Sequence, residues 1–103
     1  MPFTKGFRPH SLLGHFSDHR NDFKADSPEQ YEAMADSFMG EPLPCGVAEA
    51  VRCSNGDRLR YAPKTLAFGV VDRDGHILTF FKPQPYKHRQ ASNAEYFISE
   101  CKA

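Results

Sequence analysis

Two histidines near the start of the chain, His15 and His19, have the spacing most suggestive of chemistry. Residues four apart on a helix share one face. Two neighbouring imidazoles can divide the roles of general base and general acid near neutral pH, and they can also bind a metal ion. They could equally be partly exposed helix residues with Asp18 and Asp22 as solvated neighbours. The spacing alone therefore leaves a catalytic pair, a metal site and a plain helix surface open.

A zinc site built on these histidines would need a third ligand. The chain has no HExxH motif, and its three cysteines lack the CxxC spacing of structural zinc sites. We therefore expect no metal and no other cofactor. The odd number of cysteines argues against a disulfide framework and favours free thiols at Cys45, Cys53 and Cys101.

Three arginines flank the first predicted hairpin and are candidates for binding phosphate: Arg52, Arg58 and Arg60. The planar guanidinium donates two hydrogen bonds at once to a phosphate. Arg58 and Arg60 are two residues apart on a strand and so share a face. Alternatively, these arginines only solubilise an otherwise apolar hairpin.

Further polar candidates lie near the C-terminus. Thr79 is the one small polar residue in the apolar segment 76–82, where it is expected to share a face with Ile77 and Phe81. Its hydroxyl could hydrogen-bond a phosphate, although threonine is also a good strand former. Lys82 begins a basic stretch around Tyr86, which could contact a nucleic-acid backbone while the tyrosine stacks on a base, or could simply be solvated.

The composition limits the classes of function. The 103 residues, 40% of them hydrophobic, fit a single core and a single domain over residues 1–103. The formal net charge is zero, so only a local basic patch could attract nucleic acid. No apolar run approaches the ~18 residues of a membrane span, and no signal segment opens the chain, so we expect a cytoplasmic protein without membrane contact. The sequence has no P-loop, GxGxxG or GxSxG motif.

The first half of the chain predicts two helices after an extended arm over residues 1–10. Apolar residues recur at helical spacing from Ser11, the expected N-cap, to Phe23. Ser27 and the Pro-Glu-Gln that follows it form a strong helix start, so a second helix is expected over 28–39.

The second half predicts four strands joined by short turns, over 47–53, 58–61, 66–72 and 76–82, and a short final helix over 93–101. Helices followed by strands indicate an α+β domain, with two N-terminal helices and a four-stranded antiparallel meander. We expect the helices to pack on one face of the sheet.

Taken in order, these segments resemble a known family. Residues 15–19, HFSDH, are similar to an HFxKH pattern, and residues 75–83, GHILTFFKP, are similar to GxIxTxFxP. With Tyr96-Phe97 they resemble the compact ribonuclease toxins of the barnase, EndoU, colicin E5/D and RelE superfamily. The nearest likeness is to the small C-terminal toxin modules of bacterial contact-dependent and other polymorphic toxin systems. The resemblance covers residues 12–98, nearly the whole chain.

The resemblance implies helices followed by a four-stranded antiparallel sheet, and metal-independent cleavage of RNA such as tRNA through a cyclic phosphate. His15 would take the proton of the 2′-hydroxyl, and His19 would protonate the leaving 5′-oxygen or hold the phosphate. A toxin of this type could be delivered into the cytoplasm of a target cell, and it would need a cognate immunity protein.

The same hypothesis gives roles to the other candidates. Arg60, helped by Arg52 or Arg58, would stabilise the charge that builds on the phosphate. Thr79 would donate a hydrogen bond to a non-bridging oxygen. The remaining substrate-binding candidates are Lys82 and Tyr96, the latter closing the site.

Position 18 departs from the pattern, because the chain has Asp18 where related sequences often have lysine. A carboxylate facing the cleft would repel a phosphate. It could instead point outward or orient His19.

The alternative function is a non-catalytic module of the same fold that binds RNA or protein.

Overall fold

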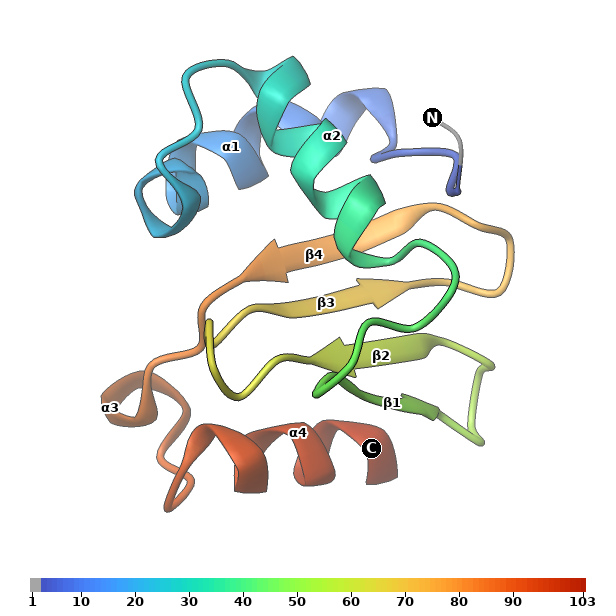
Figure 1. Ribbon diagram of the computed structural model, residues 1–103, viewed down its shortest axis with the longest axis vertical. Coiled ribbons are helices and arrows are strands. Elements are labelled where there is room, and N and C mark those ends of the chain that lie inside the picture. The colour runs from blue at the N-terminus through green and yellow to red at the C-terminus, as the bar shows by residue number, and fades with distance from the viewer. Residues whose placement is uncertain (1–2) are drawn as a thin grey trace.

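The computed structural model describes residues 3–103 and has an α+β fold (Figure 1). Its elements, in chain order, are α1 (Pro9–Phe23), α2 (Pro28–Phe38), β1 (Ala48–Val51), β2 (Arg58–Tyr61), β3 (Phe68–Val71), β4 (Ile77–Phe81), α3 (Pro85–His88) and α4 (Asn93–Lys102). The strands form one antiparallel sheet in the order β1-β2-β3-β4. The predicted order of two helices, a four-stranded meander and a C-terminal helix is thereby confirmed.

The helix starts follow local sequence signals. The Ser27 side chain accepts a hydrogen bond from the Gln30 N–H at 3.1 Å and caps α2, as predicted. Helix α1 begins earlier than expected, because Pro9 occupies its first turn and Arg8, not Ser11, is the N-cap residue. Proline suits this position because its fixed φ is already helical.

The N-terminal segment is not a free arm. Phe7 is buried and forms a parallel bridge with Ile77, and the Ile77 N–H donates to the Gly6 carbonyl at 2.9 Å. The segment therefore lies along the outer edge of β4, and residues 9–10 belong to α1. The first two residues of the predicted arm lie outside the described part of the chain.

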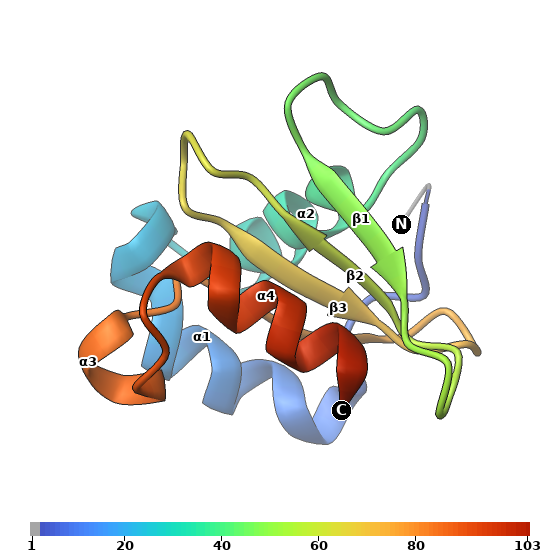
Figure 2. The same ribbon diagram turned by 90° about the horizontal axis from the view of Figure 1, so that it is seen from below.

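Helices cover both faces of the sheet, so the expectation of one covered face is wrong. Helix α2 lies on one face and α4 on the other, while α1 packs along the edge strand β4 (Figures 1 and 2). The sheet has an apolar cluster on each side, and all four residues of β3 are buried. A strand buried on both faces requires a covering layer on each.

A β-bulge changes the direction of side chains at the edge of the sheet. Val70 pairs with Thr79, but Val71 pairs with Ile77, which leaves one extra residue in β4. Ile77 therefore joins the cluster under α2, whereas Thr79 lies on the α4 side with Phe81. The prediction that Thr79 and Ile77 share a face is wrong, because a strict period of two does not reveal the bulge.

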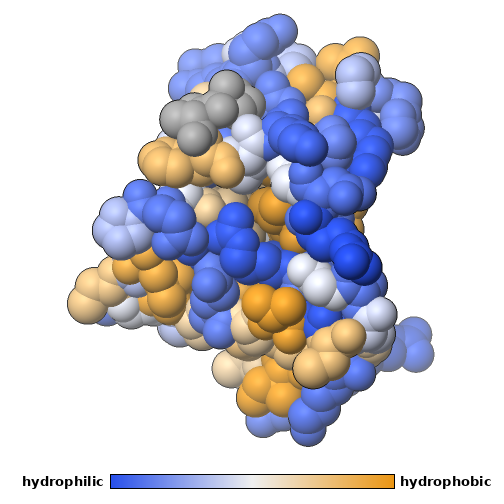
Figure 3. Space-filling view, turned by 90° about the vertical axis from the view of Figure 1, so that its right-hand side faces the viewer, coloured by the Kyte–Doolittle hydropathy of each residue, from blue (hydrophilic) through white to orange (hydrophobic). Residues whose placement is uncertain are grey.

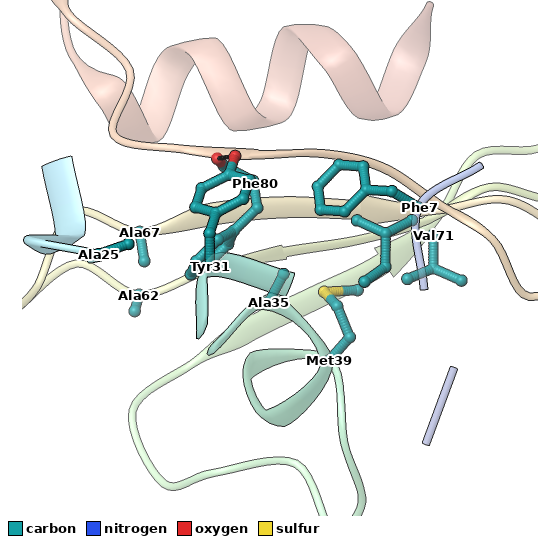
Figure 4. Close-up of a cluster of buried hydrophobic side chains, with 10 residues drawn as sticks. Phe7, Ala25, Tyr31, Ala35, Met39, Ala62, Ala67, Val71 and Phe80 are labelled. Atoms are coloured by element: carbon teal, nitrogen blue, oxygen red, sulfur yellow. Dashed lines mark hydrogen bonds between the residues drawn. The ribbon is translucent and has the colours of Figure 1, made fainter. Parts of the chain in front are cut away.

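The core on the α2 side fixes α1 and α2 against β4. Tyr31 is fully buried, and its hydroxyl donates a hydrogen bond to the Phe80 carbonyl (Figure 4). Phe23 of α1 stacks on Phe80 with ring centroids 3.9 Å apart. Burial raises the pKa of Tyr31, which keeps its hydroxyl a donor. These contacts set the orientation of α1 and hence of its histidines.

The end of the molecule that carries the β1–β2 and β3–β4 turns has hydrophilic residues with apolar residues interspersed (Figure 3). None of the helices in residues 3–103 combines the length and apolar character that crossing a membrane requires.

Candidate functional site

His15 and His19 lie together on the face of α1 that is turned toward β4. Their ring centroids are 6.1 Å apart. The His15 ring lies 5.1 Å from the Phe7 ring, and the His19 ring lies 5.1 Å from the Phe81 ring. Both histidines are half-buried, so each retains access to solvent. The shared helix face predicted from their spacing is confirmed.

The two histidines border two adjoining cavities. The first, which we call the α1–α3 cavity, has a volume of about 220 Å³ and is lined by Asp18, His19, Asp22, Phe81, Lys82, Gln84, Tyr86, Lys87 and His88. The second, of about 280 Å³, is lined by His10, Ser11, Gly14, His15, Asp18 and His19. Residues of α1, of the end of β4 and of α3 therefore surround the first cavity. His19 and Asp18 belong to both cavities and form the wall between them.

A larger cavity of about 520 Å³ lies on the α2 side, with an apolar floor that includes Phe23, Phe38 and Phe80. It contains neither histidine. Its polar lining includes Asp22 and Lys82, which also line the α1–α3 cavity. The smaller cavities are the candidate site because they hold the groups that can transfer protons.

Asp22 is placed to orient His19. Its Oδ2 atom lies 3.8 Å from Nδ1 of His19 and accepts a hydrogen bond of 3.0 Å from the Lys82 N–H. The backbone of Lys82 thus holds the carboxylate beside the imidazole. Partial burial lowers the pKa of His19, and the charges of Asp22 and Asp18 oppose that shift.

The pKa of His15 is also lowered, by burial and then by the nearby His19, with Asp18 opposing the shift. Both imidazoles are therefore mainly neutral at pH 7, where an unperturbed histidine is already mostly neutral. The state in which one of the two imidazoles is protonated and the other is neutral is therefore most populated at mildly acidic pH.

His88 and Tyr96 form an aromatic pair beside the α1–α3 cavity. Their rings stack with centroids 4.5 Å apart, and Tyr96 lies edge-on to Phe81 at 6.4 Å. His88 Nδ1 accepts from the Gln90 N–H, which leaves the ring proton on Nε2 for the 2.9 Å hydrogen bond to Asn93. Because both ring nitrogens have hydrogen-bond partners, His88 offers the cavity its ring face. Tyr96 lies next to the cavity without lining it.

Thr79 lies on the same side of β4 as Phe81, whose ring contacts His19. Thr79 is half-buried and lines neither cavity that contains a histidine. The structure brings it to the correct side of the sheet, but its hydroxyl forms no hydrogen bond with either imidazole.

Arg60 lies elsewhere, and the expectation that it is available to a phosphate is wrong. Its side chain is completely buried on the α2 side of the sheet. The guanidinium donates to the carbonyls of Phe38 and Gly40 and pairs with Glu49 and Glu41. The last carbonyls of a helix have no partner within the helix. The Arg60 guanidinium supplies hydrogen-bond donors at the end of α2, so none of its N–H groups is free for substrate.

Arg58 and Arg52 are also engaged outside the candidate site. Arg58 donates to the Met39 carbonyl at 3.0 Å on the side where Arg60 lies. Arg52 pairs with Asp57 at 3.0 Å and donates to the Glu100 carbonyl at 2.8 Å, which ties the β1–β2 turn to α4. Of the cations predicted to bind substrate, only Lys82 lines the α1–α3 cavity.

Several cavity residues have no role in the site expected from the sequence. Asp22 is three residues after His19, a spacing that places them together on a helix and could have revealed the pair. Helix α3 begins after Gln84 and brings three residues to the α1–α3 cavity: Gln84, Lys87 and His88. The prolines around it favour a loop, although Pro85 in fact starts this helix.

Within residues 3–103, no group of three or more His, Cys, Asp or Glu side chains is arranged to hold a metal ion. The three cysteines are free thiols. Comparisons of the chain with protein-family models and with curated proteins found no match. The geometry of the histidine pair is therefore the main basis for assigning a function.

Proposed function

We propose that this protein is a metal-independent ribonuclease that cleaves RNA by acid–base attack of a 2′-hydroxyl on the neighbouring phosphate. The observation that carries the proposal is the pair of half-buried imidazoles, whose ring centroids are 6.1 Å apart, beside a cavity lined by two lysines and two aspartates. Transfer of one proton to a base and another from an acid requires two groups near each other with pKa values near neutrality. His15 and His19 lie next to each other, and the ordinary pKa of histidine is close to neutrality.

The different surroundings of the two histidines support different roles. His19 has Asp22 close to Nδ1, which favours its protonated form relative to His15. We assign neutral His15 as the base that removes the 2′-hydroxyl proton, so that the oxygen attacks phosphorus. Protonated His19 gives its proton to the departing 5′-oxygen. The products are a 2′,3′-cyclic phosphate and a free 5′-hydroxyl.

The charge on the phosphate needs a cation other than Arg60. Lys82 and Lys87 line the α1–α3 cavity with His19, and neither forms an ion pair with a described residue. Preorganised cations at such a position are often the largest contribution to catalysis. Thr79 would add a hydrogen bond to a non-bridging oxygen, and Tyr96 would close the α4 side.

The biological setting belongs to the same proposal. The substrate would be tRNA or another cytoplasmic RNA, reached in the producing cell or after delivery as part of a larger toxin. A cell that makes an active ribonuclease of this kind would require a cognate immunity protein. No membrane partner is proposed.

The test is cleavage of total tRNA by the purified protein in EDTA. His15→Ala and His19→Ala should each reduce the rate at least about 100-fold, the size expected for losing a general acid or base. The control is His76→Asn, because His76 lines neither histidine cavity and its Nδ1 has no hydrogen-bond partner among the described residues. Equal cleavage by the wild type and both alanine variants would overturn the proposal.

A non-catalytic RNA-binding module is the second candidate, and the enclosed position of Arg60 favours it. In that case the wild type would retard intact RNA on a gel and produce no cyclic phosphate. Lys82→Ala would then weaken retardation, while His15→Ala would leave it unchanged.

A further inference from the structure

The cavity of about 520 Å³ on the α2 side has no role in the proposed cleavage of RNA. Its volume lies within the roughly 300–1,000 Å³ range of pockets that hold small molecules. Apolar side chains from three elements form its floor: Phe23 of α1, Met34 and Phe38 of α2, and Phe80 of β4. Phe80 is buried and the other three are partly buried. The cavity therefore offers a small molecule a mainly apolar surface.

The floor of this cavity is fixed by the core beneath it. The Phe23 and Phe80 rings are stacked nearly parallel, with centroids 3.9 Å apart, and the Phe38 ring lies 5.5 Å from that of Phe80. The buried Tyr31 hydroxyl donates to the Phe80 carbonyl and holds the strand in place. A ligand would not have to order these rings, so the entropic cost of binding is reduced.

Two lysines bring positive charge to the apolar floor. The Nζ atom of Lys82 lies 5.6 Å from the centroid of the Phe23 ring, so the ammonium is beside the floor. Lys24 also lines the cavity and is exposed. Neither lysine forms an ion pair with a residue of the described chain.

Asp22 is the one carboxylate in the lining, and it already has partners in the protein. Its Oδ2 atom accepts from the Lys82 N–H at 3.0 Å and lies 3.8 Å from Nδ1 of His19. The two lysine charges exceed its single negative charge, which leaves a cationic lining for an anionic ligand.

We propose that the α2-side cavity binds a small apolar molecule that carries one carboxylate. Its apolar part would lie on the phenylalanine floor, and its carboxylate would pair with the ammonium of Lys82. Charge-assisted hydrogen bonds of this kind are among the strongest in proteins. An amine would be repelled by both lysines, whereas a doubly charged phosphate would be more costly to desolvate beside the apolar floor and would face Asp22.

The two cavities share Lys82, so occupation of one affects the other. Lys82 also lines the α1–α3 cavity, where it is assigned to the phosphate of RNA. A carboxylate bound to its ammonium would compete with that phosphate and inhibit cleavage. This consequence rests on the proposed function, whereas binding of the carboxylate does not.

The direct test is NMR titration of the protein with 2-naphthoate and with the uncharged 2-naphthamide. At about pH 7.5 the carboxylate is ionised and lysine is protonated. The naphthoate should bind at least about tenfold more tightly than the amide, as one hydrogen bond between charged groups allows. It should shift the Met34 methyl signal and the ring protons of Phe23 and Phe38. Equal affinity for both probes, or no saturable binding at millimolar concentration, would overturn the proposal.

A matched pair of lysine variants isolates the charge. Lys82→Gln should reduce affinity for 2-naphthoate about tenfold and leave affinity for 2-naphthamide nearly unchanged. The control is Lys87→Gln, because Lys87 lines the α1–α3 cavity but not the α2-side cavity. It should bind both probes as the wild type does. An unchanged affinity for 2-naphthoate in Lys82→Gln would contradict the assigned partner.

A second pair of variants tests the location. Ser37 is exposed on α2 and lines the cavity, so Ser37→Trp should obstruct it and abolish binding of 2-naphthoate. Ala33 is exposed on the same helix and does not line the cavity, so Ala33→Trp should bind normally. Normal binding by both folded variants would place the ligand elsewhere.

Cleavage assays separate this inference from the proposed function. 2-Naphthoate should inhibit cleavage of tRNA in EDTA, and 2-naphthamide should not at the same concentration. RNA cleavage by a protein that does not bind 2-naphthoate would overturn only the carboxylate site. Lys82-dependent binding of 2-naphthoate by a protein that never cleaves RNA would support the site and overturn the ribonuclease.

Discussion

Arg60 and Lys82 are both basic residues of the sheet region, but the structure uses them in opposite ways. Arg60 is completely buried, and its donors are taken by α2 carbonyls and by Glu49 and Glu41. Lys82 follows β4, lines the α1–α3 cavity and forms no ion pair with a described residue. A cation whose donors are all used stabilises the fold, whereas one with free donors can bind a ligand.

The largest expected effect is the loss of stability when the buried Arg60 is replaced. Arg60→Ala would leave the Phe38 and Gly40 carbonyls without their donor and would leave Glu49 paired with Arg58 alone. Each buried acceptor that loses its donor typically costs about 1–3 kcal/mol. We expect a large drop in the free energy of unfolding, measured by urea denaturation followed by circular dichroism. A variant as stable as the wild type would contradict the structural role of Arg60.

Lys82→Ala should show the reverse pattern. Its stability should fall by less than about 1 kcal/mol, because the substitution removes only the cation–π interaction of the ammonium with the Phe23 ring, 5.6 Å away. The value of kcat/KM for RNA cleavage should fall about 100-fold if the lysine stabilises charge on the phosphate. An unfolded Lys82→Ala variant would contradict the small expected effect on stability. A folded variant with full activity would contradict the role of Lys82 in stabilising charge on the phosphate.

The pH dependence of RNA cleavage tests the roles of the two histidines. Burial lowers the pKa of both histidines below 6.5, and the reaction needs one neutral and one protonated imidazole. The rate should therefore peak below pH 6.5 and fall as the pH rises through neutrality, because His19 loses its proton. A rate that increases steadily up to pH 9 would exclude the assigned acid.

The smallest effect is expected from Asp22→Asn. The amide oxygen can still accept from the Lys82 N–H, but the negative charge beside His19 is removed. Because that charge favours the imidazolium, the pKa of His19 should decrease, and the alkaline limb of the rate profile should move to lower pH. NMR titration of the His19 ring proton measures the shift, with Asp26→Asn as control. An unchanged pKa would show that Asp22 does not influence His19.

The regions with strong local signals could be predicted from the sequence. The Ser27 cap marks the start of α2, and the turn residues separate the four strands, because these signals depend on neighbours in the chain. The histidine pair was predictable for the same reason. Helix α3 was missed because Pro85 can either end a strand or begin a helix.

The role of Arg60 could not be predicted, since it depends on where α2 ends in space. Its spacing from Arg58 correctly indicates a shared face, but only the tertiary structure shows that the end of α2 lies over that face. The bulge opposite Val70 and Val71 is equally hidden from a pattern of period two. The resemblance to ribonuclease toxins indicates candidate residues but not which of them meet in one cavity.

The most direct test of the central claim is end-group analysis of RNA incubated with the protein in EDTA. We expect fragments with 2′,3′-cyclic phosphate and 5′-hydroxyl ends from the wild type, and no such fragments from His15→Ala. Fragments with 5′-phosphate ends, or cyclic-phosphate fragments from both proteins in equal amount, would contradict it.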